Sequence, residues 1–596
     1  MPSYSATLLL LSLAAAPIRA QSPAAADTGV VRGQMGAALD QLLSRLAAYG
    51  LSGAMLVAKG DTVVLHRGYG LANRAANAPV APETPFMIGS LSKQITAAAI
   101  VKLEAERKLA TTDTLGKFFP GLPAEKARIT LHQLLTHTAG YPYLEPNMFA
   151  EVSREQAVRQ ALELPLDRPP GERYAYANPG YTILAGVVER ASGETFEAYL
   201  TKHLLEPAGM RSTGFMGEPR WRDARVTTHS YSDANDEGPM AGFPGIAKAV
   251  GAGSIITTAG DLFRWERALR GGALLPDSAT RKLWAPHVPT GQGPVSVSYG
   301  YGWNVVRTLR NTTLINHGGD IGGYNADMRR YADEGFTVIF LSNARSGGVG
   351  YRQAVMNSMA LTMVGAPGGL QPPAVARLSP AALRPHAGTY ALPSGARLAA
   401  RLDSAGGTAR LVLSAESQEG ISLLAGADSS RRAMEQELNA LAGRVAEAAA
   451  RGDVEPLVAA LHPSIPTDGA RDGVQAAMRA LRDTLGDFAR AEVVGTAVRS
   501  PGSATTYVRL HFARGSRLGA YGWSAVGPGQ LRIAGIDDDL PAAMATPFLP
   551  ESPTTLAAFD MFASKTVRAT FSSGSVTIAG PGGSATARRV EEAARK

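Results

Sequence analysis

Two strand-forming stretches flank a long helical region in this 596-residue chain, and their arrangement limits the folds open to it. Residues 53–70 (GAMLVAKGDTVVLHRGYG) predict a β-hairpin with its turn at 59–61. Residues 325–343 predict two more strands, joined by a turn at 333–335 and ending in FTVIFLSN. Helical patterns dominate residues 125–290. Strands at both ends of a segment with helices between them indicate one α/β (α+β) domain with a helical insert.

The character of the chain changes after a Gly/Pro-rich stretch, GAPGGLQPP, at 365–373, which we expect to be a linker. The length of the chain predicts two to four domains. Helices are also expected at 34–48, 85–108, 350–364 and within 431–486. Beyond the linker, strands are expected at GTYAL, ARLAARL, ARLVLSA and ISLLA (388–425), and at 505–512, 518–526, 531–536 and within 565–590.

The N-terminus has the pattern of a signal peptide. An apolar stretch, ATLLLLSLAAA at 6–16, is followed by Pro-Ile-Arg-Ala and a polar, Ala-rich segment, which suggests cleavage after Ala20. The stretch is shorter than the roughly 20 residues of a membrane-spanning helix. We therefore expect an exported protein, periplasmic or secreted, without a membrane span after signal removal. The alternatives are a retained anchor or a mis-assigned start, since no Lys or Arg precedes the apolar stretch.

Composition excludes several kinds of chemistry. The chain has no cysteine, so disulfides, thiolate catalysis and Cys-bound zinc are impossible. The formal net charge is +8, but Lys and Arg are scattered and no nucleic-acid motif accompanies them, so we expect no nucleic-acid partner. No His, Asp and Glu group has metal-ligand spacing, so we expect no metal and no cofactor.

Ser90 and Lys93 form an S-x-x-K pattern at the start of the predicted helix, in PFMIGSLSKQITAAAIVKL. Residues three apart on a helix share one face. A serine hydroxyl needs a base to become a nucleophile, and a lysine can be that base when burial lowers its pKa. The Ala-rich helix would supply such an apolar setting. The structural alternative is an N-cap serine beside a surface lysine.

Tyr176 and Asn178 form a Y-x-N pattern in ERYAYANPGY. A tyrosine can pass a proton to a leaving group as general acid/base. An asparagine amide can hold a substrate carbonyl or the lysine. The structural alternative is aromatic packing.

A third pattern is His317-Gly318-Gly319 in NHGGDIGG. Glycines on a strand let backbone and substrate approach closely. H-x-G is unspecific, because His66-Arg67-Gly68 and His386-Ala387-Gly388 also fit, but only His317 has a Gly-rich strand setting. The structural alternative is a hydrogen-bonded core histidine.

Taken together, these motifs resemble those of the β-lactamase-related serine hydrolases, which include class C β-lactamases, low-molecular-mass penicillin-binding proteins, D-aminopeptidases and family VIII esterases. The resemblance covers about residues 35–365 and has MIGSLSKQITAAAI, ITLHQLLTHTAGY, GERYAYANPGYTILAGVVERASG, GAGSIITTAGDLFRWERAL and NHGGDIGGY in order. It implies the serine β-lactamase/transpeptidase-like fold, with an antiparallel sheet and a helical insert.

The resemblance also implies site roles. Ser90 would be the nucleophile, Lys93 and Tyr176 the base and proton relay, and His317 part of the strand motif. Asn178, Gly318 and Gly319 would contact substrate. The backbone N–H groups of Ser90 and Asp320 would form the oxyanion hole. His137, in the LLTHTAGY stretch, is interpreted as structural.

One departure from the family bears on substrate. Class C β-lactamases carry Lys-Thr-Gly where this chain has His317-Gly318-Gly319, and histidine is at most partly charged at neutral pH. This argues against efficient β-lactam hydrolysis and favours ester or peptide substrates. We expect an exported hydrolase that forms an acyl-enzyme on an amide or ester. The alternative is a penicillin-binding sensor that is acylated with little turnover.

The C-terminal third carries two weaker resemblances. RPHAGTYALPSGARLAARL and FLPESPTTLAAFDMFASKTVRATF resemble the two ends of a lipocalin-like β-barrel, and 430–542 resembles an NTF2-like (SnoaL-like) α+β cone inserted between them. Such a cone could bind a ligand, pack as a structural module or support self-association. The expected divisions are a signal peptide 1–20, a flexible leader 21–33, the hydrolase domain 34–366, a linker 367–380, and a barrel, 381–429 and 543–592, interrupted by 430–542.

Overall fold

The computed structural model describes residues 29–143, 152–223, 228–232, 235–240, 249–291, 295–345, 349–404, 408–427, 429–463, 465, 467–527, 530–537 and 539–590. The expected signal peptide, 1–20, and most of the expected leader lie outside the described residues. The last part of that leader differs from expectation. Val30–Val31 (β1) pairs with β3 as a strand at one edge of the main sheet, with Val30 opposite His66.

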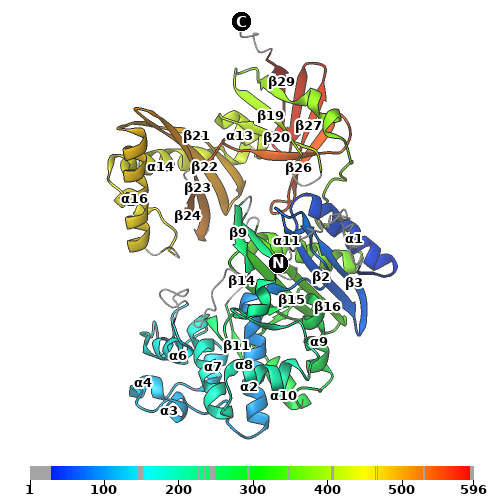
Figure 1. Ribbon diagram of the computed structural model, residues 1–596, viewed down its shortest axis with the longest axis vertical. Coiled ribbons are helices and arrows are strands. Elements are labelled where there is room, and N and C mark those ends of the chain that lie inside the picture. The colour runs from blue at the N-terminus through cyan, green and yellow to red at the C-terminus, as the bar shows by residue number, and fades with distance from the viewer. Residues whose placement is uncertain are drawn as a thin grey trace, which may run out of the picture.

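A nine-stranded sheet, entirely antiparallel in its pairings, forms the centre of the N-terminal domain (Figure 1), in the order β1-β3-β2-β16-β15-β14-β13-β12-β11. Its remaining strands are Gly53–Lys59 (β2), Thr62–Tyr69 (β3), Val288–Pro289 (β11), Ser296–Tyr299 (β12), Asn304–Arg307 (β13), Thr313–Ile321 (β14), Tyr324–Tyr331 (β15) and Phe336–Ser342 (β16). The pairing of β2 with β16 confirms that distant segments build one sheet, with Val57 opposite Val338.

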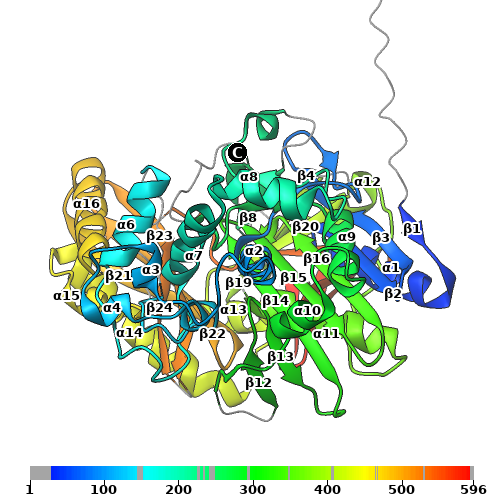
Figure 2. The ribbon, with the colours of Figure 1, turned by 90° about the horizontal axis from the view of Figure 1, so that it is seen from below.

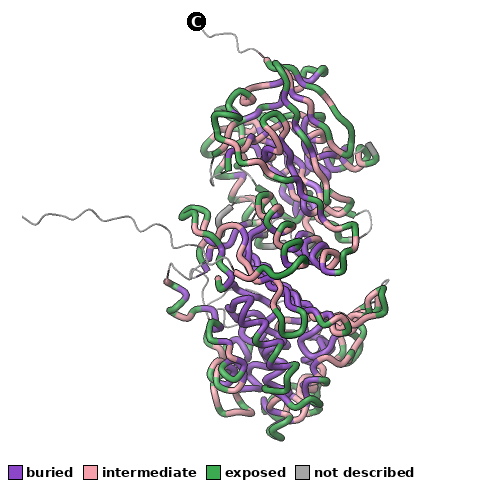
Figure 3. Tube along the Cα trace, turned by 90° about the vertical axis from the view of Figure 1, so that its right-hand side faces the viewer, coloured by how far each residue is buried: buried purple, intermediate pink, exposed green. Residues whose placement is uncertain are grey.

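Strands β2 and β16 are buried on both faces, so each supplies side chains to two cores. Leu56 and Ile339, which face each other, pack into the core on the helical side. Val57 and Val338 pack into the opposite core, where helices α1 (Gly33–Ala48) and α11 (Val349–Met363) cover the sheet. Alternating side chains on a strand explain this division. In Figure 3 the buried segments run through the interior of this domain.

The region between β3 and β11 is mainly helical, as expected, and covers the other face of the sheet (Figure 2). It also contains short strands that the sequence patterns did not predict, in the sheets β6-β10-β7 and β4-β5 and in the pair β8-β9, which is joined by β17 from beyond β16 to form the sheet β17-β8-β9. The helices are Ser92–Ala105 (α2), Leu115–Phe118 (α3), Ala124–Ala127 (α4), Leu131–Leu135 (α5), Arg154–Glu163 (α6), Asn178–Ser192 (α7), Phe196–Leu200 (α8), Ala259–Arg270 (α9) and Asp277–Leu283 (α10). The short strands are Leu71–Asn73 (β4), Ala78–Pro79 (β5), Phe86–Met87 (β6), Gly214–Phe215 (β7), His229–Ser232 (β8), Asn235–Pro239 (β9), Ile255–Thr257 (β10) and Ala344–Arg345 (β17).

The C-terminal third contains a closed eight-stranded barrel (Figure 1), in the order β18-β19-β20-β25-β26-β27-β28-β29. Its strands are Gly388–Ala391 (β18), Arg397–Asp403 (β19), Arg410–Ala415 (β20), Thr546–Pro550 (β25), Thr555–Asp560 (β26), Lys565–Ser572 (β27), Ser575–Gly580 (β28) and Gly583–Arg589 (β29). A short helix, Pro380–Leu383 (α12), precedes it. The ring of Phe559 on β26 contacts Tyr49, just after α1, at 5.6 Å between centroids, so the barrel packs against the N-terminal domain.

The chain between β20 and β25 forms a four-stranded antiparallel sheet with helices. The strands are Phe488–Ser500 (β21), Ser503–Phe512 (β22), Gly515–Gly527 (β23) and Gln530–Asp537 (β24), and the helices are Gln418–Leu424 (α13), Arg432–Arg451 (α14), Glu455–Ala459 (α15) and Thr467–Leu485 (α16). The expected strand ISLLA is wrong, because it lies in α13. Ser417 caps this helix by accepting a hydrogen bond from the Gly420 N–H, and Ile421 and Leu424 are buried on one side.

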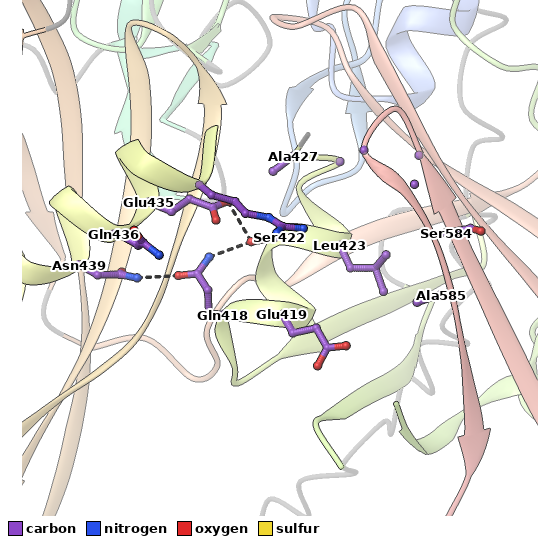
Figure 4. Close-up of a pocket in the computed structure, with 15 residues that line it drawn as sticks. Gln418, Glu419, Ser422, Leu423, Ala427, Glu435, Gln436, Asn439, Ser584 and Ala585 are labelled. Carbon is purple, nitrogen blue, oxygen red and sulfur yellow. Dashed lines mark hydrogen bonds between the residues drawn. The ribbon is translucent and has the colours of Figure 1, made fainter. Parts of the chain in front are cut away.

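A polar network joins α13 to the inserted sheet and borders an open pocket of about 550 Å³ (Figure 4). The Gln418 amide oxygen accepts from Asn439 Nδ2 at 2.8 Å and from the Thr496 N–H at 2.8 Å. Ser422 Oγ donates to Glu435 at 2.9 Å. Because these groups satisfy one another, the network ties the inserted sheet to α13, and α13 in turn packs against the barrel through Ile421 and Leu424. All residues that line the pocket belong to the barrel and the insert, and we assign them no part in the chemistry below.

Within the described part of the chain, no helix combines the length and the apolar character that crossing a membrane requires.

Candidate active site

Ser90 lies in a single 3-10 turn, Gly89–Leu91 (η1), just before α2 rather than on it. Gly89 has a φ of +48°, and a Cβ there would lie 2.8 Å from the backbone nitrogen of Asp320. A side chain at position 89 would therefore be both strained and obstructed. This turn still places Ser90 next to Lys93 in the first turn of α2, where Lys93 Nζ lies 3.1 Å from Ser90 Oγ.

Lys93 is completely buried, so the alternative of a surface lysine is wrong. Its Nζ donates to Asn178 Oδ1 at 2.7 Å and to the Ala252 carbonyl at 2.8 Å. Tyrosine rings cover the amine, with Nζ 4.9 Å from the Tyr176 centroid and 5.5 Å from that of Tyr181. Burial lowers the pKa of Lys93 well below its usual value.

Tyr176 and Asn178 lie where the chain enters α7. Asn178 is the first residue of that helix and Pro179 the second, in the first turn, where proline is tolerated because its missing N–H costs no hydrogen bond. Burial raises the pKa of the Tyr176 phenol well above its usual value, and a hydrogen bond with Ser90 acts in the opposite direction. The structure thus brings Ser90, Lys93, Tyr176 and Asn178 together.

His317 lies on β14 and is buried, with both ring nitrogens engaged. Nδ1 lies 2.6 Å from the Gly318 carbonyl, which can only accept, so Nδ1 carries the proton. Nε2 then accepts from the Tyr299 hydroxyl at 2.9 Å. Burial lowers the pKa of His317 to about 3, so the ring is neutral at physiological pH. Its ring lies 6.2 Å from that of Tyr176, measured between centroids.

The two glycines of this motif face opposite sides of the sheet. A Cβ at Gly318 would lie 2.8 Å from Nη2 of Arg352 on α11, while a Cβ at Gly319 would lie 1.9 Å from the Ile88 carbonyl oxygen and 2.9 Å from the Ser90 nitrogen. Close approach of backbone is therefore the reason for Gly319, as expected. Gly318 instead makes room for an arginine, which the sequence did not indicate.

Asp320 ends the motif, and its half-exposed carboxylate pairs with Arg352 at 2.9 Å. Arg352 also donates to the Gly319 carbonyl at 3.1 Å. The contacts of Gly89 and Gly319 bring residues 88–90 alongside the end of β14. The backbone nitrogens of Ser90 and Asp320 consequently lie at the same junction.

The sequence patterns missed two contributors to this site. The Ala252 carbonyl holds Lys93, and the only available signal was the GAGSIITTAGDLFRW stretch. Tyr299, on β12, holds His317, and nothing in its sequence context distinguished it from a core tyrosine. In the part of the chain that the structure covers, no three His, Asp or Glu side chains gather in a way that would hold a metal ion.

Comparison with known proteins agrees with this geometry. The β-lactamase family model matches residues 39–357. Penicillin-binding protein 4* of Bacillus subtilis (strain 168) is 27% identical over 338 residues, which are 53% of this chain and 73% of that protein. Esterase EstB of Burkholderia gladioli is 29% identical over 210 residues, 32% of this chain and 53% of the esterase.

Among solved structures, the octameric penicillin-binding protein homologue from Pyrococcus abyssi aligns with a TM-score of 0.51 and 17% identity. It covers 93% of this chain and 100% of its own, and at this identity it supports the fold alone. The family match spans more than half of the sequence and includes the segments that carry the S-x-x-K, Y-x-N and H-x-G motifs. The chain belongs to the β-lactamase family and is a serine hydrolase with the β-lactamase/transpeptidase-like fold.

Proposed function

We propose that this protein is an exported hydrolase that forms an acyl-enzyme at Ser90 on ester or amide substrates. The observation that carries the proposal is the fully buried amine of Lys93, 3.1 Å from the Ser90 hydroxyl. Because its pKa is lowered, this amine can be neutral at working pH and accept the serine proton during attack. A surface lysine would stay protonated and could not do so.

Tyr176 is the proton relay in this proposal. Since the pKa of its phenol is raised, the phenol keeps its proton until a leaving group can take it. Ser90 Oγ bonds to the carbonyl carbon, and its proton goes to Lys93. The bond to the leaving alcohol or amine then breaks as Tyr176 donates a proton to it and regains one from Lys93. Water attacks the acyl-Ser90 ester by the same route and releases the acid.

Backbone groups would stabilise the negative charge of the tetrahedral intermediate. The N–H groups of Ser90 and Asp320 are the proposed oxyanion hole, supported by the close packing of Gly89 and Gly319. Loss of one such donor typically costs about a hundred- to a thousandfold in rate. Asn178 holds Lys93 through its Oδ1 and is the proposed contact for the substrate amide or carbonyl.

The substrates we propose are esters and amides without a carboxylate next to the scissile bond. His317 is neutral, so the strand motif supplies no cation. Arg352 is committed to Asp320 and lies 3.6 Å from Asp327. A penicillin or a C-terminal peptide carboxylate would thus lack an opposite charge at this strand. We expect poor β-lactam hydrolysis for that reason.

The test compares three probes on the purified protein: a fluorophosphonate, a fluorescent penicillin and p-nitrophenyl butyrate, with Ser90→Ala as the control. We expect fluorophosphonate labelling and steady ester turnover that are both absent in Ser90→Ala. Equal turnover by Ser90→Ala would remove Ser90 from the mechanism. A stoichiometric burst of penicillin labelling without ester turnover would instead favour an acylatable sensor.

Two further proposals concern the rest of the chain. Export is supported by the apolar N-terminal stretch and its Ala-rich flank. We also propose that 430–542 is an NTF2-like module inserted into a lipocalin-like barrel and that it supports self-association. The helix-then-sheet order and the closure of the barrel across β20 and β25 favour the inserted module. Light scattering of the protein with and without 430–542 would test the self-association.

A further inference from the structure

We propose that His137 is the positioning residue for Tyr176, setting the phenol against Ser90 and Lys93 without taking part in proton transfer. The inference rests on the proposed function, in which Tyr176 relays the proton. It also assigns a role to a histidine that the motif alone presented as structural.

His137 holds the segment 175–177 at three points. Its carbonyl accepts from the Ala175 N–H at 2.8 Å, and its Nδ1 accepts from the Ala177 N–H at 3.1 Å. Between these two anchors, its ring lies against that of Tyr176, with centroids 4.2 Å apart and planes 32° apart. The backbone on both sides of Tyr176 and the face of its ring are therefore fixed by one residue.

The backbone at His137 is unusual for a residue with a side chain. It has a φ of +57° and follows the end of α5. The N–H groups of His137 and Thr138 bond to the carbonyls of Leu134 and Gln133, at 3.3 and 2.8 Å. This is the Schellman helix ending, in which the left-handed position usually holds glycine. A non-glycine residue there costs about 1–2 kcal/mol, which the contacts of His137 have to offset.

The contact with the Tyr176 segment needs both an aromatic ring and a hydrogen-bond acceptor for the Ala177 N–H, and histidine combines the two. Glycine would relieve the backbone but has neither ring nor acceptor, and phenylalanine has a ring but no acceptor for the Ala177 N–H. Asparagine tolerates a positive φ and has an acceptor but no ring. The ring is 2% exposed and its Nε2 has no hydrogen-bond partner among the described residues. Burial also lowers the pKa of His137 well below its usual value, so the ring holds Tyr176 without adding a charge beside Lys93.

His137→Gly is the most informative variant, because glycine suits the helix ending while the ring and the acceptor are lost. We expect kcat for p-nitrophenyl butyrate to fall about 10- to 100-fold with KM changed less than about threefold, since a shift near 1 Å can cost about a hundredfold. His137→Asn keeps the backbone conformation and is the second variant if His137→Gly does not fold. It should show the same split between kcat and KM.

The decisive measurement is a double-mutant cycle with Tyr176→Phe. If His137 acts through Tyr176, removing the hydroxyl should cost about a hundredfold or more in the native background but less than about tenfold in His137→Gly. Losses that multiply would overturn the inference, because they would mean that the two residues act independently. Unchanged kcat in both His137 variants would overturn it too.

The matched control is His132→Asn. His132 lies on α5, half-buried, with its Nδ1 on the Tyr301 hydroxyl at 2.8 Å. We expect kcat of this variant to stay within about threefold of native. A loss equal to that of His137→Asn would overturn the inference, because it would mean that any disturbance near α5 lowers kcat. If instead Ser90→Ala or Tyr176→Phe stays fully active, the proposed function is wrong, and the inference about His137 is then wrong as well. If both variants lose activity but the rate losses of His137→Gly and Tyr176→Phe multiply, the proposed function stands and only the positioning role of His137 is overturned.

Discussion

Replacing Gly319 by alanine should separate β14 from the serine turn. The added Cβ would lie 1.9 Å from the Ile88 carbonyl oxygen, whereas real Cβ contacts stay above 3.0 Å. Strand β14 and the segment at Ile88 must therefore move apart by about 1.1 Å. The position of the added Cβ is fixed by the strand backbone, and the oxygen it meets belongs to the Ile88 backbone, so neither atom can rotate away. A displacement of about 1 Å at the reacting atoms costs about a hundredfold in rate. We expect kcat/KM for p-nitrophenyl butyrate to fall at least about a hundredfold.

Gly318→Ala is the matched control, one residue earlier on the same strand. Its Cβ would lie 2.8 Å from the end of the Arg352 side chain, which can shift by a few tenths of an ångström. We expect a loss of at most about tenfold in kcat/KM, which corresponds to about 1.4 kcal/mol. Ester kinetics, the rate of fluorophosphonate labelling and thermal unfolding would be measured for both. The reasoning is refuted if Gly319→Ala stays within about threefold of native, or if the two variants lose equally.

Two more predictions concern ionisable groups. Lys93→Met should lower ester turnover by about a hundred- to ten-thousandfold, because the base is lost, and slow fluorophosphonate labelling in parallel; normal labelling would mean that another group activates Ser90. His317→Gln should change how stability depends on pH. The pKa of His317 is about 3 in the folded protein and about 6.5 unfolded, so between these values only the unfolded state binds the proton. Native stability should then fall relative to the variant by about 1.4 kcal/mol per pH unit as pH drops below 6.5. Urea unfolding followed by tryptophan fluorescence from pH 7 to pH 4 would measure this, and parallel curves for the two proteins would contradict the buried, neutral histidine.

Local patterns were sufficient for the strands and helices whose environment matches their sequence. Strands β2 and β16 were predictable because their apolar runs favour strands buried on both faces. Helix α1 was predictable from its leucine stripe. Ser90, Lys93 and Tyr176, the proposed nucleophile, base and proton relay, were identified because their spacing and order carry the resemblance, and the structure places all three together.

Local patterns failed where contacts with other segments determine the secondary structure. ISLLA has the composition of a strand, but Ser417 caps it as helix α13 against the barrel. Strand β21 was missed because FARAEVVGTAVRS mixes charged and apolar residues and shows no strand pattern. Its pairing with β22 stabilises the strand instead. Val30–Val31 was assigned to the leader, because a two-residue edge strand leaves no periodicity to detect.

What the sequence determined by itself was the set of candidate reactive groups and the kind of sheet beside them, because the order and spacing of motifs and the apolar pattern of strands are local properties. What only the tertiary structure decided was their chemical state. Lys93 loses its usual basicity and His317 its charge through burial by residues far away in the chain, including Tyr181 beside the amine and Tyr299 on the imidazole. Desolvation depends on everything packed around a group, and no stretch of sequence contains that information.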